Sequence, residues 1–208
     1  MGTRNLTMVI SNGKTKVAQY GQWDGYPDGQ GMTALSTLKR IILSGELGQF
    51  KTKVDNLEWL TQEQCDEINA TKKWDEKHPY LSRDCAAQIL SAIHFGKMEV
   101  HAGIGERKEI DVKVIGLQDN SDFAADSLFC EWAYVIDLDK GTFEVYEGFN
   151  KQPLSESDRF YALQATKEKD NEYYPVKLLA SFELDNLPTE SEFLAIDKEE
   201  EETEDLPM

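Results

Sequence analysis

Hydrophobic and polar residues alternate from the start of the chain. The stretch NLTMVIS puts its leucine, methionine and isoleucine on one face of an extended segment, which is the two-residue period of a strand. Asn12-Gly13 follows, and both residues accept a positive φ, as a tight two-residue hairpin turn requires. Together with the return stretch KTKVAQY, this pattern predicts a β-hairpin over residues 5–20.

The spacing of apolar residues then changes to that of a helix. It predicts a helix from Thr33 to Leu43, with Thr33 as the N-cap and Ser44-Gly45 as the end. The residues expected on its buried face are Leu35, Leu38, Ile41 and Ile42.

Further helices are predicted in the middle of the chain. Residues 46–80 are polar and favour helix, and Thr61 with Gln64 three positions later forms a capping-box pattern. Ser82 is expected to cap another helix, which ends at Gly96. The apolar stripe of that helix consists of Ala86, Ile89, Leu90 and Ile93.

The second half of the chain returns to strand patterns. A second hairpin is expected around the turn Asp139-Lys140-Gly141. The almost continuously apolar run Trp132–Ile136 indicates a central strand that is buried on both faces. The predicted ranges are 111–117, 129–139, 142–148 and 174–184 for strands, and 190–196 for a short helix after Pro188-Thr189.

This order of elements, a hairpin, then helices, then strands, predicts an α+β fold. We expect a largely antiparallel sheet of hairpins with packed helices. The 208 residues suffice for one domain with a substantial core, which we place at 1–196, followed by an acidic disordered tail at 197–208.

The chain is strongly acidic, with a net charge of −17. The tail segment DKEEEETED holds seven acids and one lysine, so it supplies −6 and leaves about −11 on the body. Such a field repels nucleic acid and attracts a basic partner, including a protein surface that normally holds DNA or RNA. Solubility alone is the other explanation of the charge.

The remaining composition excludes several classes of protein. Three widely separated cysteines without a Cys-x-x-Cys pair indicate a reducing compartment, and three histidines lack the spacing of a zinc site. No run of about 18 apolar residues and no signal-peptide pattern is present. We therefore expect a cytoplasmic protein without a metal or cofactor.

The stretch VAQYGQWDGYPDGQG, residues 17–31, combines glycines with large aromatic residues. Its spacing fits neither a phosphate-binding Walker loop nor a dinucleotide fingerprint. As a binding surface it could stack Tyr20, Trp23 and Tyr26 on a flat group, with Gln22 and Asp24 for hydrogen bonds. Alternatively, Trp23 and Tyr26 fold inward and pack into the core at the end of the sheet.

Arg4, just before the first strand, is a further candidate. It could clamp a carboxylate or phosphate of a ligand, or it could pin the N-terminus by pairing with Asp24 or Glu131.

Four segments carry a resemblance to a known family. MGTRNLT, KVAQYGQWDGYPDGQG and CEWAYVIDLDKGTFEVYEG, with LSRD before a helix, resemble a set of uncharacterised proteins from bacteriophages and bacteria that has distant relatives in fungi. The resemblance covers most of residues 1–148. It implies a phage or mobile-element context, and it assigns no catalytic residue.

A weaker resemblance concerns the fold alone. The order of elements is similar to that of N-terminal nucleophile hydrolases, which implies an αββα sandwich and a nucleophile at the first residue of the mature chain. The matching residue is Thr3, which would require loss of Met1 and Gly2.

Three functions follow from these observations. The first is an accessory protein that binds a host protein through an acidic surface in the host cytoplasm, as a counter-defence factor. The second is a protein that binds a small, nucleotide-like ligand through the loop of residues 20–26. The third is a hydrolase that uses Thr3, and it is disfavoured because ordinary removal of Met1 would expose Gly2, which has no side chain to act as a nucleophile.

Overall fold

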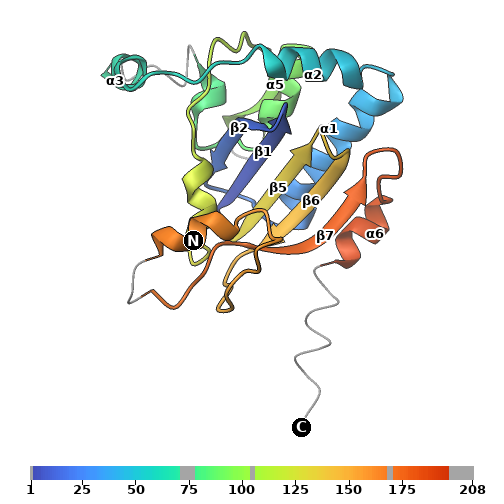
Figure 1. Cartoon of the computed structure of the whole chain (residues 1–208). Helices are drawn as coiled ribbons and strands as arrows, with labels where there is room; N and C mark the ends of the chain where they lie inside the picture. Colours follow the sequence, from blue (N-terminus) through green and yellow to red (C-terminus); the bar gives the residue numbers. More distant parts are fainter. Residues whose placement is uncertain (1, 71–77, 104–105, 168–170, 197–208) are drawn as a thin grey trace.

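The computed structural model describes residues 2–70, 78–103, 106–167 and 171–196. Its centre is a five-stranded sheet with the strand order β2-β1-β5-β6-β7, and β3 pairs with β4 in a separate ribbon. The fold is α+β, as the sequence predicts (Figure 1). The strands are β1 Asn5–Ser11, β2 Lys14–Gly21, β3 Lys97–Gly103, β4 Glu106–Asp111, β5 Trp132–Asp137, β6 Thr142–Glu147 and β7 Lys177–Glu183.

Both predicted hairpins form. β1 pairs antiparallel with β2, and β5 pairs antiparallel with β6. Asn12 and Gly13 make the first turn with φ values of 53° and 67°, the left-handed conformation that this turn requires. Gly141 in the second turn has a φ of 74°.

β5 is the central strand, and all six of its residues are buried, which confirms the prediction from its apolar run. On its other side β5 pairs with β1, and this pair is parallel. Parallel neighbours need a crossover connection. The chain between β1 and β5, residues 12–131, contains β2 and, among its described residues, several helices and the β3–β4 ribbon.

Helices cover one face of the sheet (Figure 1). Apolar side chains of α1, α2, α5 and α6 share a core with Val9, Tyr134 and Phe143 of the sheet. α3 lies at the periphery of the molecule (Figure 1). The helices are α1 Met32–Leu43, α2 Leu47–Asp55, α3 Gln62–Ala70, α5 Gln88–Phe95 and α6 Glu190–Ala195.

Short 3-10 turns cover the opposite face. The turns at Ser121–Ala125 and near Tyr161–Thr166 bring Ala124 and Phe160 against Leu6 and Met8 of β1. No second sheet stacks on this face in the part of the chain that the structure describes, so these residues do not form an αββα sandwich. The covering segments lack the alternating apolar pattern that a second sheet would need.

The prediction of a strand at residues 111–117 is wrong. β4 ends at Asp111, and the stretch 112–117 is not a strand. Leu117 instead makes an isolated parallel bridge with Trp59, supported by backbone hydrogen bonds to residues 58 and 60. The apolar alternation of this stretch serves packing against the helical layer rather than a sheet.

Helix ends were predicted with mixed success. Thr61 and Gln64 form the expected capping box, Thr189 caps α6, and Gly96 ends α5 with a φ of 67°. Thr33 is not an N-cap, because a π-helical turn at Pro27–Gly31 already precedes it. Ser82 does not cap a helix either, since residues 82–85 first form a turn and α5 begins at Gln88.

None of the helices among the described residues is both long and apolar enough to cross a membrane. The predicted acidic tail lies outside the described residues, and the domain range 1–196 stays a prediction.

Candidate functional site

Residues 20–31, here called the corner loop, turn sharply at the end of the sheet where β1 and β5 begin. Backbone hydrogen bonds fix the path: the Gly25 amide donates to the Thr3 carbonyl at 3.0 Å, and the Gln22 amide donates to the Arg83 carbonyl at 2.8 Å. The Tyr134 hydroxyl, from the central strand, donates to the Gly25 carbonyl at 2.7 Å. The loop is therefore a rigid corner tied to both β1 and the segment before α5.

The glycines of the corner loop permit close approach rather than unusual backbone angles. None of them has a positive φ. A Cβ atom on Gly29 would overlap the carbonyl oxygen of Asp24, so no larger residue fits beside that backbone. The predicted turn at residues 26–29 forms, with the Gly29 amide donating to the Tyr26 carbonyl at 3.0 Å.

Trp23 and Tyr26 point outward. Their exposed fractions are 48% and 49%, so they do not plug the end of the sheet. The Trp23 indole N–H donates to the Asp84 carboxylate at 2.8 Å, which holds the ring in one orientation. Gly2 lies against the indole, because a Cβ atom placed on Gly2 would overlap the six-membered ring. The exposed ring is thus positioned by contacts from two other segments.

A cavity of about 610 Å³, here called the corner cleft, opens beside Trp23. One wall comes from the corner loop and the segment that precedes α5, and the other comes from the β3–β4 ribbon. Its lining includes Trp23, Asp24, Asp84, Glu99, Arg107 and Asp111.

The corner cleft is mixed in charge but acidic on balance. Four carboxylates line it, together with the cations Arg107 and Lys108. Arg107 lies 3.8 Å from the Glu99 carboxylate, so part of the positive charge is already compensated. Asp24 has a φ of 59°, a left-handed conformation that aspartate tolerates.

The structure does not bring all predicted site residues together. Trp23 and Asp24 line the corner cleft, whereas Tyr20 lines a second pocket on the other side of the loop. The Tyr20 hydroxyl donates to Gln22 at 2.6 Å, and burial raises the pKa of this phenol. Tyr26 is exposed beside the cleft without lining it.

Arg4 pins the N-terminal end of β1. Its guanidinium lies 3.4 Å from the Glu131 carboxylate and 4.5 Å above the centre of the Phe129 ring. Glu131 is one of the two partners that the sequence predicts for Arg4. Arg4 is therefore engaged within the protein, and it does not line the corner cleft.

Thr3 is buried, and its carbonyl accepts the hydrogen bond from the corner loop. None of the described residues makes a hydrogen bond to its hydroxyl. The hydrolase hypothesis, which needs a chain that starts at Thr3, stays a prediction.

Two of the cysteines are buried. Cys85, at the floor of the corner cleft, and Cys130 are fully buried, and this burial, with nearby acidic residues, raises the pKa of both thiols far above the usual range.

Sequence reasoning missed Asp84 and the β3–β4 ribbon as parts of the site. The LSRD segment contains Asp84, but only the folded chain shows that it meets Trp23 across 61 positions. The residues of the β3–β4 ribbon form no recognisable sequence motif. They line the corner cleft only because the folded chain between β1 and β5 places the ribbon there.

Comparison of the chain with protein-family models, with curated proteins and with solved structures gives no match.

Proposed function

We propose that this protein is an accessory binding protein, and that the corner cleft docks an arginine side chain on a basic surface of a partner protein. The family resemblance of residues 1–148 is the reason to expect a phage or mobile-element origin, a host protein as the partner and a counter-defence role. The proposal rests on one observation above all, the outward orientation of Trp23 and Tyr26 on a rigid loop.

The aromatic residues support a docking role. Tryptophan and tyrosine are enriched among the residues that contribute most to protein–protein binding energy. Trp23 is already held by Asp84 and Gly2, so little ordering entropy is lost when a partner covers it.

The charges of the corner cleft support arginine as the docked group. A guanidinium can stack on an indole face and form two parallel hydrogen bonds to a carboxylate. Asp24 and Asp84 line the same cleft as the Trp23 ring, so both interactions are offered in one place. The overall charge of −17 adds long-range attraction for a basic surface.

A titration with a small probe tests this proposal directly. N-acetyl-arginine amide is added to the full chain while the indole N–H signals are followed by NMR, with a Trp23→Phe variant to assign the signal. We expect a saturable shift of the Trp23 signal. The uncharged analogue N-acetyl-citrulline amide should bind at least about tenfold more weakly, because it lacks the charge-assisted contact.

Asp84→Asn keeps the size of the side chain and should reduce the arginine affinity, whereas Glu190→Gln on α6 serves as the matched control and should not. Equal shifts with arginine and citrulline probes, or unchanged affinity in Asp84→Asn, would contradict the proposal.

A small ligand remains the second candidate function, because Tyr20 lines a pocket that is separate from the corner cleft.

A further inference from the structure

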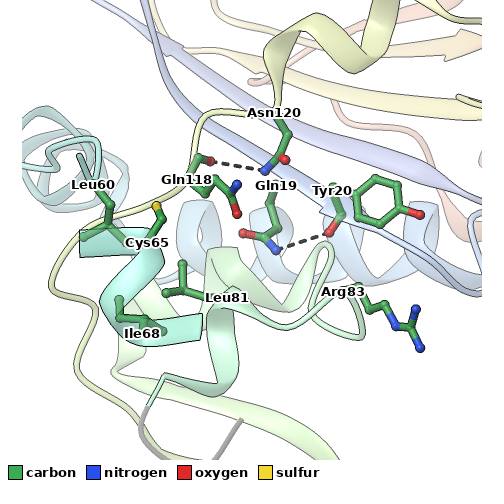
Figure 2. Close-up of a pocket in the computed structure, with 9 residues that line it drawn as sticks. All are labelled: Gln19, Tyr20, Leu60, Cys65, Ile68, Leu81, Arg83, Gln118 and Asn120. Atoms are coloured by element: carbon green, nitrogen blue, oxygen red, sulfur yellow. Dashed lines mark hydrogen bonds between the residues drawn. The ribbon is translucent and has the colours of Figure 1, made fainter. Parts of the chain in front are cut away.

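The second pocket lies between the edge strand β2 and the peripheral helix α3 (Figure 2). Its volume is about 210 Å³. Sites for drug-sized molecules run from roughly 300 to 1,000 Å³, so this pocket fits a smaller compound, of the size of a single ring system. We call it the amide pocket, because three carboxamide side chains, Gln19, Gln118 and Asn120, line it.

The two sides of the amide pocket differ in chemistry. The carboxamides gather on one side, and Leu60, Ile68 and Leu81 form an apolar side together with Cys65 (Figure 2). A flat ring fits such a slot, because its faces are apolar and its edge carries hydrogen-bonding groups.

Hydrogen bonds within the protein decide which amide atoms are left for a ligand. The Gln19 amide nitrogen donates to the backbone carbonyls of Tyr20, Ser82 and Cys85, at 3.2, 3.5 and 2.9 Å. Gln19 is only 5% exposed, so these bonds fix a buried side chain. The Oε1 atom makes no hydrogen bond with a described residue and stays available as an acceptor.

Asn120 repeats this arrangement. Its amide nitrogen donates to the carbonyls of Ala18 and Gln118, at 3.2 and 3.3 Å, which leaves its Oδ1 atom as a second acceptor. The Gln118 side chain makes no hydrogen bond with a described residue and can donate as well as accept. The pocket therefore presents two fixed acceptors and one adaptable amide.

We infer that the amide pocket binds an amino-substituted nitrogen heterocycle, the chemical class of the amino-bearing nucleobases adenine and cytosine. The exocyclic amino group supplies the donors that the fixed acceptors require, and the ring nitrogens accept from Gln118. Arg83 also lines the pocket and makes no ion pair with a described carboxylate, so it provides a positive charge for a phosphate on the ligand.

Cys65 offers a direct measurement of occupancy. It is partly exposed on the apolar side of the pocket, while Cys85 and Cys130 are buried. Alkylation of the full chain by iodoacetamide, followed by intact-mass measurement, therefore reports on this position.

We expect adenosine and cytidine to slow the alkylation of Cys65 in a saturable way. Inosine and uridine carry a carbonyl oxygen in place of the amino group, so they should bind at least about tenfold more weakly. Adenosine monophosphate should bind more tightly than adenosine, and Arg83→Gln should remove that difference.

Gln118→Leu should weaken adenosine binding by about tenfold, since it removes the adaptable amide without breaking a bond within the protein. Gln62→Leu, on the same helix as Cys65 but outside the pocket, is the matched control and should bind normally. Absence of protection by all four nucleosides, or equal protection by the amino and carbonyl forms, would overturn the inference. Trp23→Ala should leave the protection unchanged, so this result is independent of the proposed docking function.

Discussion

At the scale of single residues, Trp23 is the side chain on which the proposed function depends. Its ring is exposed, yet it is fixed from one side by Asp84 and from another by Gly2. An exposed aromatic ring that is held in place differs from a mobile surface residue, because its binding orientation is set before a partner arrives.

A methyl group at Gly2 should test this positioning. In Gly2→Ala the new Cβ atom overlaps the indole ring, so the ring must move away from its orientation beside Asp84. We expect the affinity for the arginine probe to fall about fivefold, which corresponds to about 1 kcal/mol of lost cation–π contact. The NMR titration of the indole signal measures it.

Gly48→Ala is the control for this experiment. Gly48 lies in α2, and a Cβ atom there meets no other atom within 4 Å. Its arginine affinity should equal that of the parent protein. Unchanged affinity in Gly2→Ala would show that the Trp23 orientation does not matter for binding.

At the scale of elements, the two hairpin turns are joined by one carboxylate. Asp139 lies in the turn between β5 and β6. Its carboxylate accepts hydrogen bonds from the backbone amides of Asn12 and Gly13, in the turn between β1 and β2, at 3.0 and 2.8 Å. Lys51 of α2 contacts the same carboxylate at 2.8 Å. These bonds, with the amide of Gly13 contributing most, lower the pKa of Asp139 to about 2.

This lowered pKa predicts a specific acid sensitivity. An unfolded aspartate titrates near 3.9, so the contribution of Asp139 to stability is present above that pH and is lost as the pH falls towards about 2. Asp139→Asn should therefore lose less stability than the parent protein between about pH 4 and pH 2, as measured by urea unfolding at each pH. Asp185→Asn, at an exposed position, should behave like the parent, and an identical acid response of Asp139→Asn would contradict the prediction.

The elements themselves were largely predictable, for reasons that differ from one to the next. The Asn-Gly turn and the apolar run of β5 are local signals, and both gave the observed structure. The parallel pairing of β1 with β5 joins residues that are more than a hundred positions apart, and no local pattern encodes it. Apolar and polar residues alternate in the stretch 112–117 as in a strand, but this stretch does not pair with any strand of the two sheets.

The candidate site was predictable only in part. The aromatic residues of the corner loop stand out by composition, but the orientation of Trp23 depends on contacts with Gly2 and Asp84 that only the fold creates. The amide pocket has no motif, because its three carboxamides come from β2 and from the segment before the central strand.

At the scale of the whole molecule, charge and shape point to the same kind of partner. The chain carries a net charge of −17, and the corner cleft adds a local acidic and aromatic site at one end of the sheet. Association driven by such a field weakens as salt rises, because exposed charges are screened beyond about 8 Å at physiological ionic strength. A basic partner should therefore bind more slowly at high salt, while the contact with Trp23 limits how fast it leaves.

Photo-crosslinking from the corner loop tests the central claim most directly. The full chain, with Tyr26 replaced by benzoylphenylalanine, is irradiated in host cells, and the attached peptides are identified by mass spectrometry. The account predicts one partner protein that is attached through an arginine-containing surface, and loss of this product when Trp23→Ala is added. The same photoreactive group at Tyr161, which is 37% exposed, should not give this product. No product from position 26, or the same products from both positions, would contradict the claim that the corner cleft is the docking site.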